Sequence, residues 1–427
     1  MKYFYKIIVI LNLIVFAEQS QANTLMESLN SAYKNNSKLN AERASMRASK
    51  EEKNEAVGEF LPSITISGYS SEQDNTGGAG DSNFKPSEQS MLIEQKIFQG
   101  FSGVANLKKK KYGENLAKFQ LKKIEQDTLL AATEAHTGYL LNKEKVRINL
   151  INIDILERQV ETAQNRLEKG EINLADLAQF EASLAGAQAE LITAKNDLIT
   201  SELNFEKIIG KKPQDNTQIT KNINLNLPQS LASSYKIASS ENPDLQISLL
   251  EYEQAKLDVV IATSDLSPSA TLSYKVAEQD DMSATIKDRT QKTVTATASW
   301  PLFKGGSNYF NLKKVKEIKN QKQLLFEDSK KSNETDVANA WSSLQSSESF
   351  LNSIKSQVRA AEIANEGITS EYESGNSRTT LEVSQSRQAL LDARINLATS
   401  NRNFLISQFN LLSAIGQLTA KDLGLKQ

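Results

Sequence analysis

Residues 293–306 read TVTATASWPLFKGG. Val294, Ala296 and Ala298 alternate with threonines, and Trp300 continues the apolar row. This period of two predicts a strand with one apolar and one polar face. A proline and two glycines then end the strand. An upstream segment, ATLSYKV at residues 270–276, alternates in the same way and predicts the other strand of a pair.

The chain contains two copies of one unit. In each copy a helical stretch leads into two strand-like segments, and these lead into two long helical runs on either side of Gly170 or Gly375. Repeated units of this kind bury their faces against one another. We therefore expect an elongated architecture with a sheet at one end and a helical bundle below it. The matching positions, 206 residues apart, are Leu25, Ala32, Leu39 and Pro62, and Leu231, Ala238, Leu245 and Pro268.

The long runs carry heptad repeats. Apolar residues recur every seven positions on both sides of each glycine, which is the seam of a coiled coil. Each copy is therefore predicted to hold an antiparallel helical hairpin that turns at its glycine. A helix of nearly seventy residues is about 100 Å long. The clearest ladders are Leu177, Leu184, Leu191, Leu198 and Phe205, and Val383, Leu390, Leu397, Phe404 and Leu411.

The N-terminus has the pattern of an export signal. Lys2 and Lys6 precede an apolar run of about ten residues, too short to span a bilayer, and a small-residue site ends at Ala22. We predict a signal peptide at 1–22, a first repeat at 23–212, a linker at 213–227, a second repeat at 228–417 and a tail at 418–427. The first repeat holds strands at about 61–73 and 88–99 and a helical hairpin at about 101–210. The second repeat holds strands at about 268–279 and 291–303 and a helical hairpin at about 306–416.

Composition excludes several classes of protein. The 50 basic and 52 acidic residues nearly cancel, which argues against a nucleic-acid binder. There is no cysteine, so neither a disulfide nor an N-terminal lipid on cysteine is available. The single histidine, His136, lies inside a helical run and has no second histidine or cysteine to complete a common zinc site. We expect no catalytic residues, no cofactor and no metal, and hence no enzyme.

The residues alone leave the architecture open. Heptads by themselves fit a secreted or surface coiled-coil structural protein, and a monomeric substrate-binding or adaptor protein is a third reading. The apolar strand faces would meet each other in a soluble sandwich, or face lipid in an outer-membrane barrel. Four strands cannot close an open barrel, which needs about eight, whereas three chains would supply twelve.

The order of signal, helix, strand pair and helical hairpin, twice over, resembles the TolC family of outer-membrane channel proteins. The resemblance covers essentially the whole mature chain and rests on Pro-Leu-Phe-Lys-Gly-Gly at 301–306, on Gly375 with Arg378-Thr379 and Leu381-Glu382-Val383 after it, and on the block 403–416. It implies a homotrimer whose twelve-stranded β-barrel lies in outer-membrane lipid and continues as a helical barrel into the periplasm. Such a channel is the passive exit duct of a tripartite efflux pump or type I secretion system. A periplasmic adaptor and an inner-membrane transporter, ABC-type or proton-driven, would open its tip.

The resemblance also implies roles for residues near the turns. Tyr372 and Arg378 match residues that tether the closed tip to an aspartate, here Asp176. A threonine beside that aspartate in the family is replaced by Ala175, so one tether is missing. The aperture ring is implied at Glu382 and at Gln385, where the second acidic charge is lost. Adaptor docking is implied at the tips, with Arg166, Gly170 and Gly375.

Overall fold

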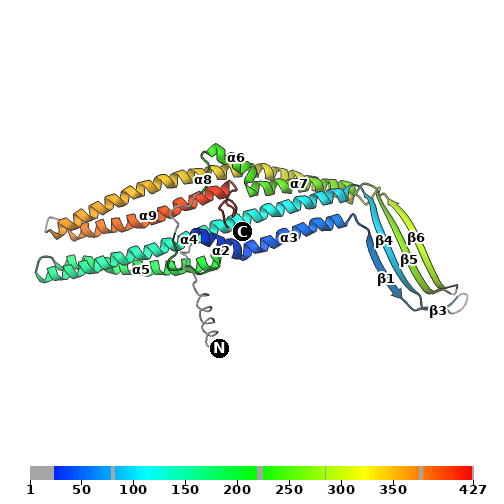
Figure 1. Cartoon of the computed structure of the whole chain (residues 1–427), viewed down its shortest axis with the longest axis horizontal. Coiled ribbons are helices and arrows are strands. Elements are labelled where there is room, and N and C mark those ends of the chain that lie inside the picture. Colours follow the sequence, from blue (N-terminus) through cyan, green and yellow to red (C-terminus); the bar gives the residue numbers. More distant parts are fainter. Residues whose placement is uncertain (1–23, 78–81, 219–224, 284, 375–377, 426–427) are drawn as a thin grey trace, which may run out of the picture. The chain divides into compact units, whose positions relative to one another are not determined.

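The computed structural model describes residues 24–77, 82–218, 225–283, 285–374 and 378–425 (Figure 1). The predicted signal peptide and Gly375 lie outside these ranges. The described residues divide into two compact units, one within 41–123 and 239–334, the other within 24–40, 124–238 and 335–425. We call them the strand unit and the hairpin unit and describe each by itself.

The strand unit holds a four-stranded antiparallel sheet in the order β1-β4-β5-β6, with bounds β1 Ser63–Ser70, β4 Ser87–Gln99, β5 Ser269–Ser283 and β6 Ile286–Ser299. Pairing of β4 with β5 joins the strands of the two copies into one sheet (Figure 1). The short strands β2, Gln73–Asn75, and β3, Ser82–Phe84, pair separately. The sequence predicts a polar loop between the second pair of strands. Instead, β5 and β6 extend into that segment up to the Ser283–Ile286 pair.

The register gives the sheet one apolar face. Opposed residues in antiparallel strands project to the same side, and Ala296 lies opposite Leu272, which lies opposite Gln95 in β4. Two residues further along each strand, a continuous row on the same face consists of Val294, Tyr274, Ile93 and Ile64. Thr293, Thr295 and Thr297 of β6 lie on the other face. Ile66, 81% exposed, and Val294, 70% exposed, have no cover from the described chain.

Charged contacts hold helices together in the strand unit. Within this unit, α4, Ser102–Glu168, contacts α3, Ser37–Gly58, through Lys53 and Glu114 at 2.6 Å. It contacts α7, Pro243–Ser264, through Lys109 and Asp258, also at 2.6 Å. The side chains of both pairs are partly buried.

The hairpin unit contains two pairs of long helices. The part of α4 after residue 124 runs beside α5, Leu174–Ile209, and the part of α8, Ser307–Glu373, after residue 335 runs beside α9, Thr380–Ala414 (Figure 1). Buried heptad positions hold each pair: Ala163 of α4 packs on Phe180 of α5, and Val358 of α8 packs on Ala393 of α9.

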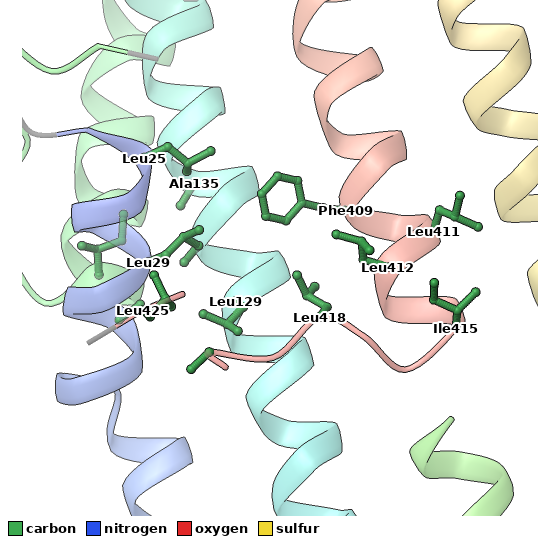
Figure 2. Close-up of a cluster of buried hydrophobic side chains, with 14 of the residues drawn as sticks. Leu25, Leu29, Leu129, Ala135, Phe409, Leu411, Leu412, Ile415, Leu418 and Leu425 are labelled. Carbon is green, nitrogen blue, oxygen red and sulfur yellow. The ribbon is translucent and has the colours of Figure 1, made fainter. Parts of the chain in front are cut away.

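The main core of the hairpin unit lies where several helices meet. Figure 2 shows Leu25 and Leu29 of α2, Leu25–Asn35, gathered with Leu129 of α4, Phe409 of α9 and other apolar side chains. Ala238 of α6, Leu231–Glu241, joins the same cluster. His136 is fully buried beside it, and its Nδ1 lies 2.9 Å from the Ser28 hydroxyl. Burial lowers the pKa of His136 to about 4, while the nearby Gln218 backbone raises it slightly.

Candidate functional site at the helical turns

The first turn is built by a glycine and a capping box. Gly170 has φ of +74°, a conformation that favours glycine, and the Glu171 N–H donates back to the Arg166 carbonyl at 2.9 Å. Asn173 then caps α5: its side chain accepts from the Asp176 N–H at 3.0 Å, and the Asp176 carboxylate accepts from the Asn173 N–H at 3.2 Å. Local sequence thus fixes the position of the Asp176 carboxylate.

The second copy repeats this construction. Thr379 caps α9, and Glu382 occupies the place of Asp176 in the box, 206 residues later. The Thr379 N–H donates to Glu382 Oε2 at 2.8 Å, and Arg378 Nη1 donates to Oε1 at 3.1 Å. The Thr379 backbone first, and then the Arg378 guanidinium, hold the pKa of the exposed Glu382 carboxyl below its usual value. This carboxylate is therefore ionised at neutral pH.

A hydrogen bond links the two hairpins at their turns. The hydroxyl of Thr380, the first residue of α9, donates to Asp176 Oδ1 at 2.9 Å. Thr380 is only 7% exposed, and Asp176 is half-buried. Asp176 therefore uses one oxygen to cap its own helix and the other to hold the neighbouring hairpin. This contact was not predicted from the sequence.

Tyr372 makes the second link between the hairpins. The Arg166 guanidinium lies 4.9 Å from the centre of its ring, and the Phe180 ring packs edge-on at 6.2 Å. Burial raises the pKa of Tyr372, with a smaller opposite effect from Arg166. Its hydroxyl is buried and has no hydrogen-bond partner in the described part of the chain. The ring lines a cavity of about 450 Å³ with Arg166 and Glu171.

The predicted tether between Arg378 and Asp176 is not formed within the single chain and stays a prediction. The Arg378 guanidinium contacts Glu371 at 2.6 Å and Glu382 at 3.1 Å. Both carboxylates belong to its own hairpin and lie within seven residues of it, so they are nearer partners than a residue on α5. The structure thus brings Asp176 together with Thr380, and brings Tyr372 together with Arg166.

The other predicted residues are placed individually. Gln385 is exposed and lines a cavity of about 300 Å³ between α4, α5 and α9. Ala175 is exposed beside Asp176. Among the described residues, no group of three acidic or histidine side chains could hold a metal ion. None of the described helices is both long and apolar enough to cross a membrane.

Comparison with known proteins identifies the family. The model of the outer membrane efflux protein family matches residues 28–211 and 234–417, which is most of both copies. The chain belongs to the outer membrane efflux protein family. Among its relatives, this efflux protein is 26% identical to the outer membrane efflux protein BepC of Brucella suis biovar 1, over 97% of this chain and 90% of that protein. It is 25% identical to the outer membrane protein TolC of Escherichia coli K12, over 99% and 88%.

Solved structures share the fold of this efflux protein. The Campylobacter jejuni CmeC outer membrane channel superposes with a TM-score of 0.84 at 14% identity, covering 92% of this chain and 86% of that one. The Vibrio cholerae outer membrane protein VceC superposes with a TM-score of 0.80 at 16% identity, covering 92% and 96%. The predicted TolC-family resemblance is confirmed. The protein is an outer-membrane efflux duct that extends into the periplasm, and its family consists of transport channels rather than enzymes.

Proposed function

We propose that this efflux protein is a homotrimeric, passive exit duct whose periplasmic tip is held closed by contacts between its two helical hairpins. The observation that carries this proposal is the Thr380–Asp176 hydrogen bond at the turns, supported by the packing of Tyr372 on Arg166. Both contacts join α4 and α5 to α8 and α9. Separation of the hairpins would break them.

The sheet supports a trimer. Its four strands share a row of apolar side chains on one face, with Val294 and Ile66 left exposed by the described chain, and β1 and β6 are its edges. Exposed edges invite pairing with another chain. Three copies joined edge to edge would give a closed barrel of twelve strands, with the apolar face toward lipid and the threonine face toward the lumen.

The turns are the proposed docking end for an adaptor. Gly170 carries the first turn, with no other chain segment within 4 Å of the position a side chain would occupy. A passive duct has no energy source of its own, so an inner-membrane transporter, reached through the adaptor, must supply it. Drugs and type I secretion substrates are both compatible with this arrangement. In the trimer, Arg378 would be free to exchange Glu371 for a carboxylate of the next copy.

Purification from detergent-solubilised outer membrane tests the proposal. We expect the mass of a trimer by multi-angle light scattering, strand signal in the circular dichroism spectrum, and discrete conductance steps in planar bilayers. A soluble monomer in the periplasmic fraction would refute the duct. It would favour the coiled-coil structural protein that the heptads alone permit.

A further inference from the structure

A large cavity that opens to solvent lies in the hairpin unit, away from the turns. It has a volume of about 600 Å³ and lies between the middle of α4 and the paired helices α8 and α9. Much of its wall is aliphatic. The apolar residues come from all three helices and include Ile148, Ile151, Ile155, Val358, Leu390 and Leu397.

The charges around this cavity do not balance. Arg147 is neutralised by Glu144 at 2.5 Å, and Arg394 by Glu362 at 2.9 Å. The third guanidinium, Arg387, has no carboxylate within 4.0 Å among the described residues. Its Nη1 atom is buried and has no hydrogen-bond partner in that part of the chain. The cavity wall therefore carries one unmatched positive charge.

Arg387 is kept charged despite this burial. Desolvation lowers its pKa and the field of Glu373 opposes the change, but an arginine side chain does not lose its proton in proteins. Arg387 as a whole is only partly buried, but its buried Nη1 donor lacks a partner among the described residues, and native proteins normally pair such groups. The side chain also lines the smaller cavity toward α5, so its guanidinium lies between the two hairpins.

We propose that this cavity binds an amphiphilic organic anion, with a carboxylate or sulfonate on Arg387 and an apolar body along the aliphatic wall. The guanidinium fork suits an oxyanion that accepts two parallel hydrogen bonds. A volume of about 600 Å³ falls within the range of small-molecule sites, which are mostly apolar with a few fixed polar groups. The lining residues lie away from the turns, so the site does not depend on the contacts there.

A matched pair of aromatic probes tests the site. Isothermal titration of the amphipol-solubilised protein with 2-naphthoate should give saturable binding, at least tenfold tighter than with neutral 2-naphthamide. Arg387→Gln should weaken 2-naphthoate at least tenfold and leave 2-naphthamide unchanged. Arg359→Gln is the matched control, because it removes one positive charge at an exposed position of α8. It should leave the affinities for both probes at their wild-type values.

Several outcomes would overturn the proposal. Equal affinity of the wild-type protein for the two probes would show that the anionic group does not contribute to binding. This comparison uses only the wild-type protein and does not depend on the folding of a variant. Equal 2-naphthoate affinity in the wild type and Arg387→Gln would remove the role of Arg387. Failure of the wild type to bind either probe, together with loss of trimer in Arg387→Gln, would mean that an acidic side chain of a second copy fills the cavity. Arg387→Lys keeps the charge but lacks the fork, and should bind with intermediate affinity.

Discussion

The Thr380–Asp176 hydrogen bond gives a direct test of the closed tip. Thr380→Val keeps the shape of the side chain and removes only the hydroxyl that donates to Asp176 Oδ1. A hydrogen bond to a charged group contributes about 1.5 to 3 kcal/mol. We take the lower end because Asp176 is half-buried. Since about 1.4 kcal/mol is a factor of ten, each link should favour the closed state about tenfold.

Single-channel recording in planar bilayers measures this bias. Thr380→Val should raise the open probability by about tenfold if the three tips of a trimer move independently, and by up to about a thousandfold if they open together. Thr399→Val is the matched control. It removes a hydroxyl from the same helix, but that hydroxyl donates to the Ile395 carbonyl within α9 at 2.9 Å.

A double-mutant cycle separates the inter-hairpin contact from helix capping. Asp176→Asn disturbs both the cap of α5 and the link to Thr380, whereas Thr380→Val disturbs only the link. The coupling between the two substitutions should therefore recover about 1.5 kcal/mol. Additive effects, or an open probability in Thr380→Val equal to that of the wild type, would show that this hydrogen bond does not hold the tip closed.

Four further predictions follow from the structure. Ala296→Arg on the apolar sheet face should cost about 2 to 4 kcal/mol if the site lies at mid-bilayer and lower the yield of folded trimer, whereas Thr297→Arg on the opposite face should not. Because the folded-state pKa of His136 is lowered to about 4 from an unfolded value near 6.5, the folded state binds fewer protons. Stability should therefore fall by up to about 3 kcal/mol as the pH drops from about 6.5 to 4, and His136→Gln should flatten this part of the thermal-denaturation profile. Glu382→Gln should weaken block of the channel by multivalent cations, as measured by conductance titration. Gly170→Trp should abolish export, because a bulky residue at this positive φ would distort the turn. The trimer should remain intact, because the surrounding space is open. Normal export would contradict the docking assignment.

The strands were predictable from the sequence, but their neighbours were not. Alternation at 293–299 is enough to specify a strand and its apolar face. A period of two fixes which side chains share a face and leaves open which strand lies alongside. The pairing of β4 with β5 joins residues nearly two hundred positions apart, such as Met91 and Val276. That pairing depends on how the two copies pack, which no local pattern encodes.

At the turns, too, the local contacts were predictable from the sequence and the long-range contact was not. Asn173 with Asp176 and Thr379 with Glu382 have the spacing of capping boxes, so the sequence contained a signal for both. The link from Thr380 to Asp176 joins residues 204 positions apart. It became visible only once the two hairpins were placed side by side. The Arg378–Asp176 pair is not formed within the single chain, where Glu371 and Glu382 of the same hairpin contact the guanidinium, and it stays a prediction.

Under the proposed gating, the duplicated turn would keep the tip ordered while its two hairpins separate. Asp176 and Glu382 each use their carboxylate to cap the helix that follows the turn, and these contacts are local and survive separation of the hairpins. Only the second oxygen of Asp176 reaches across, whereas the second oxygen of Glu382 is held by Arg378 of its own hairpin. Opening by this route would cost one charged hydrogen bond and the stacking of Tyr372 on Arg166 per chain, on the order of 2 to 4 kcal/mol. A partner that binds the separated hairpins more tightly by this amount would be sufficient to open the duct.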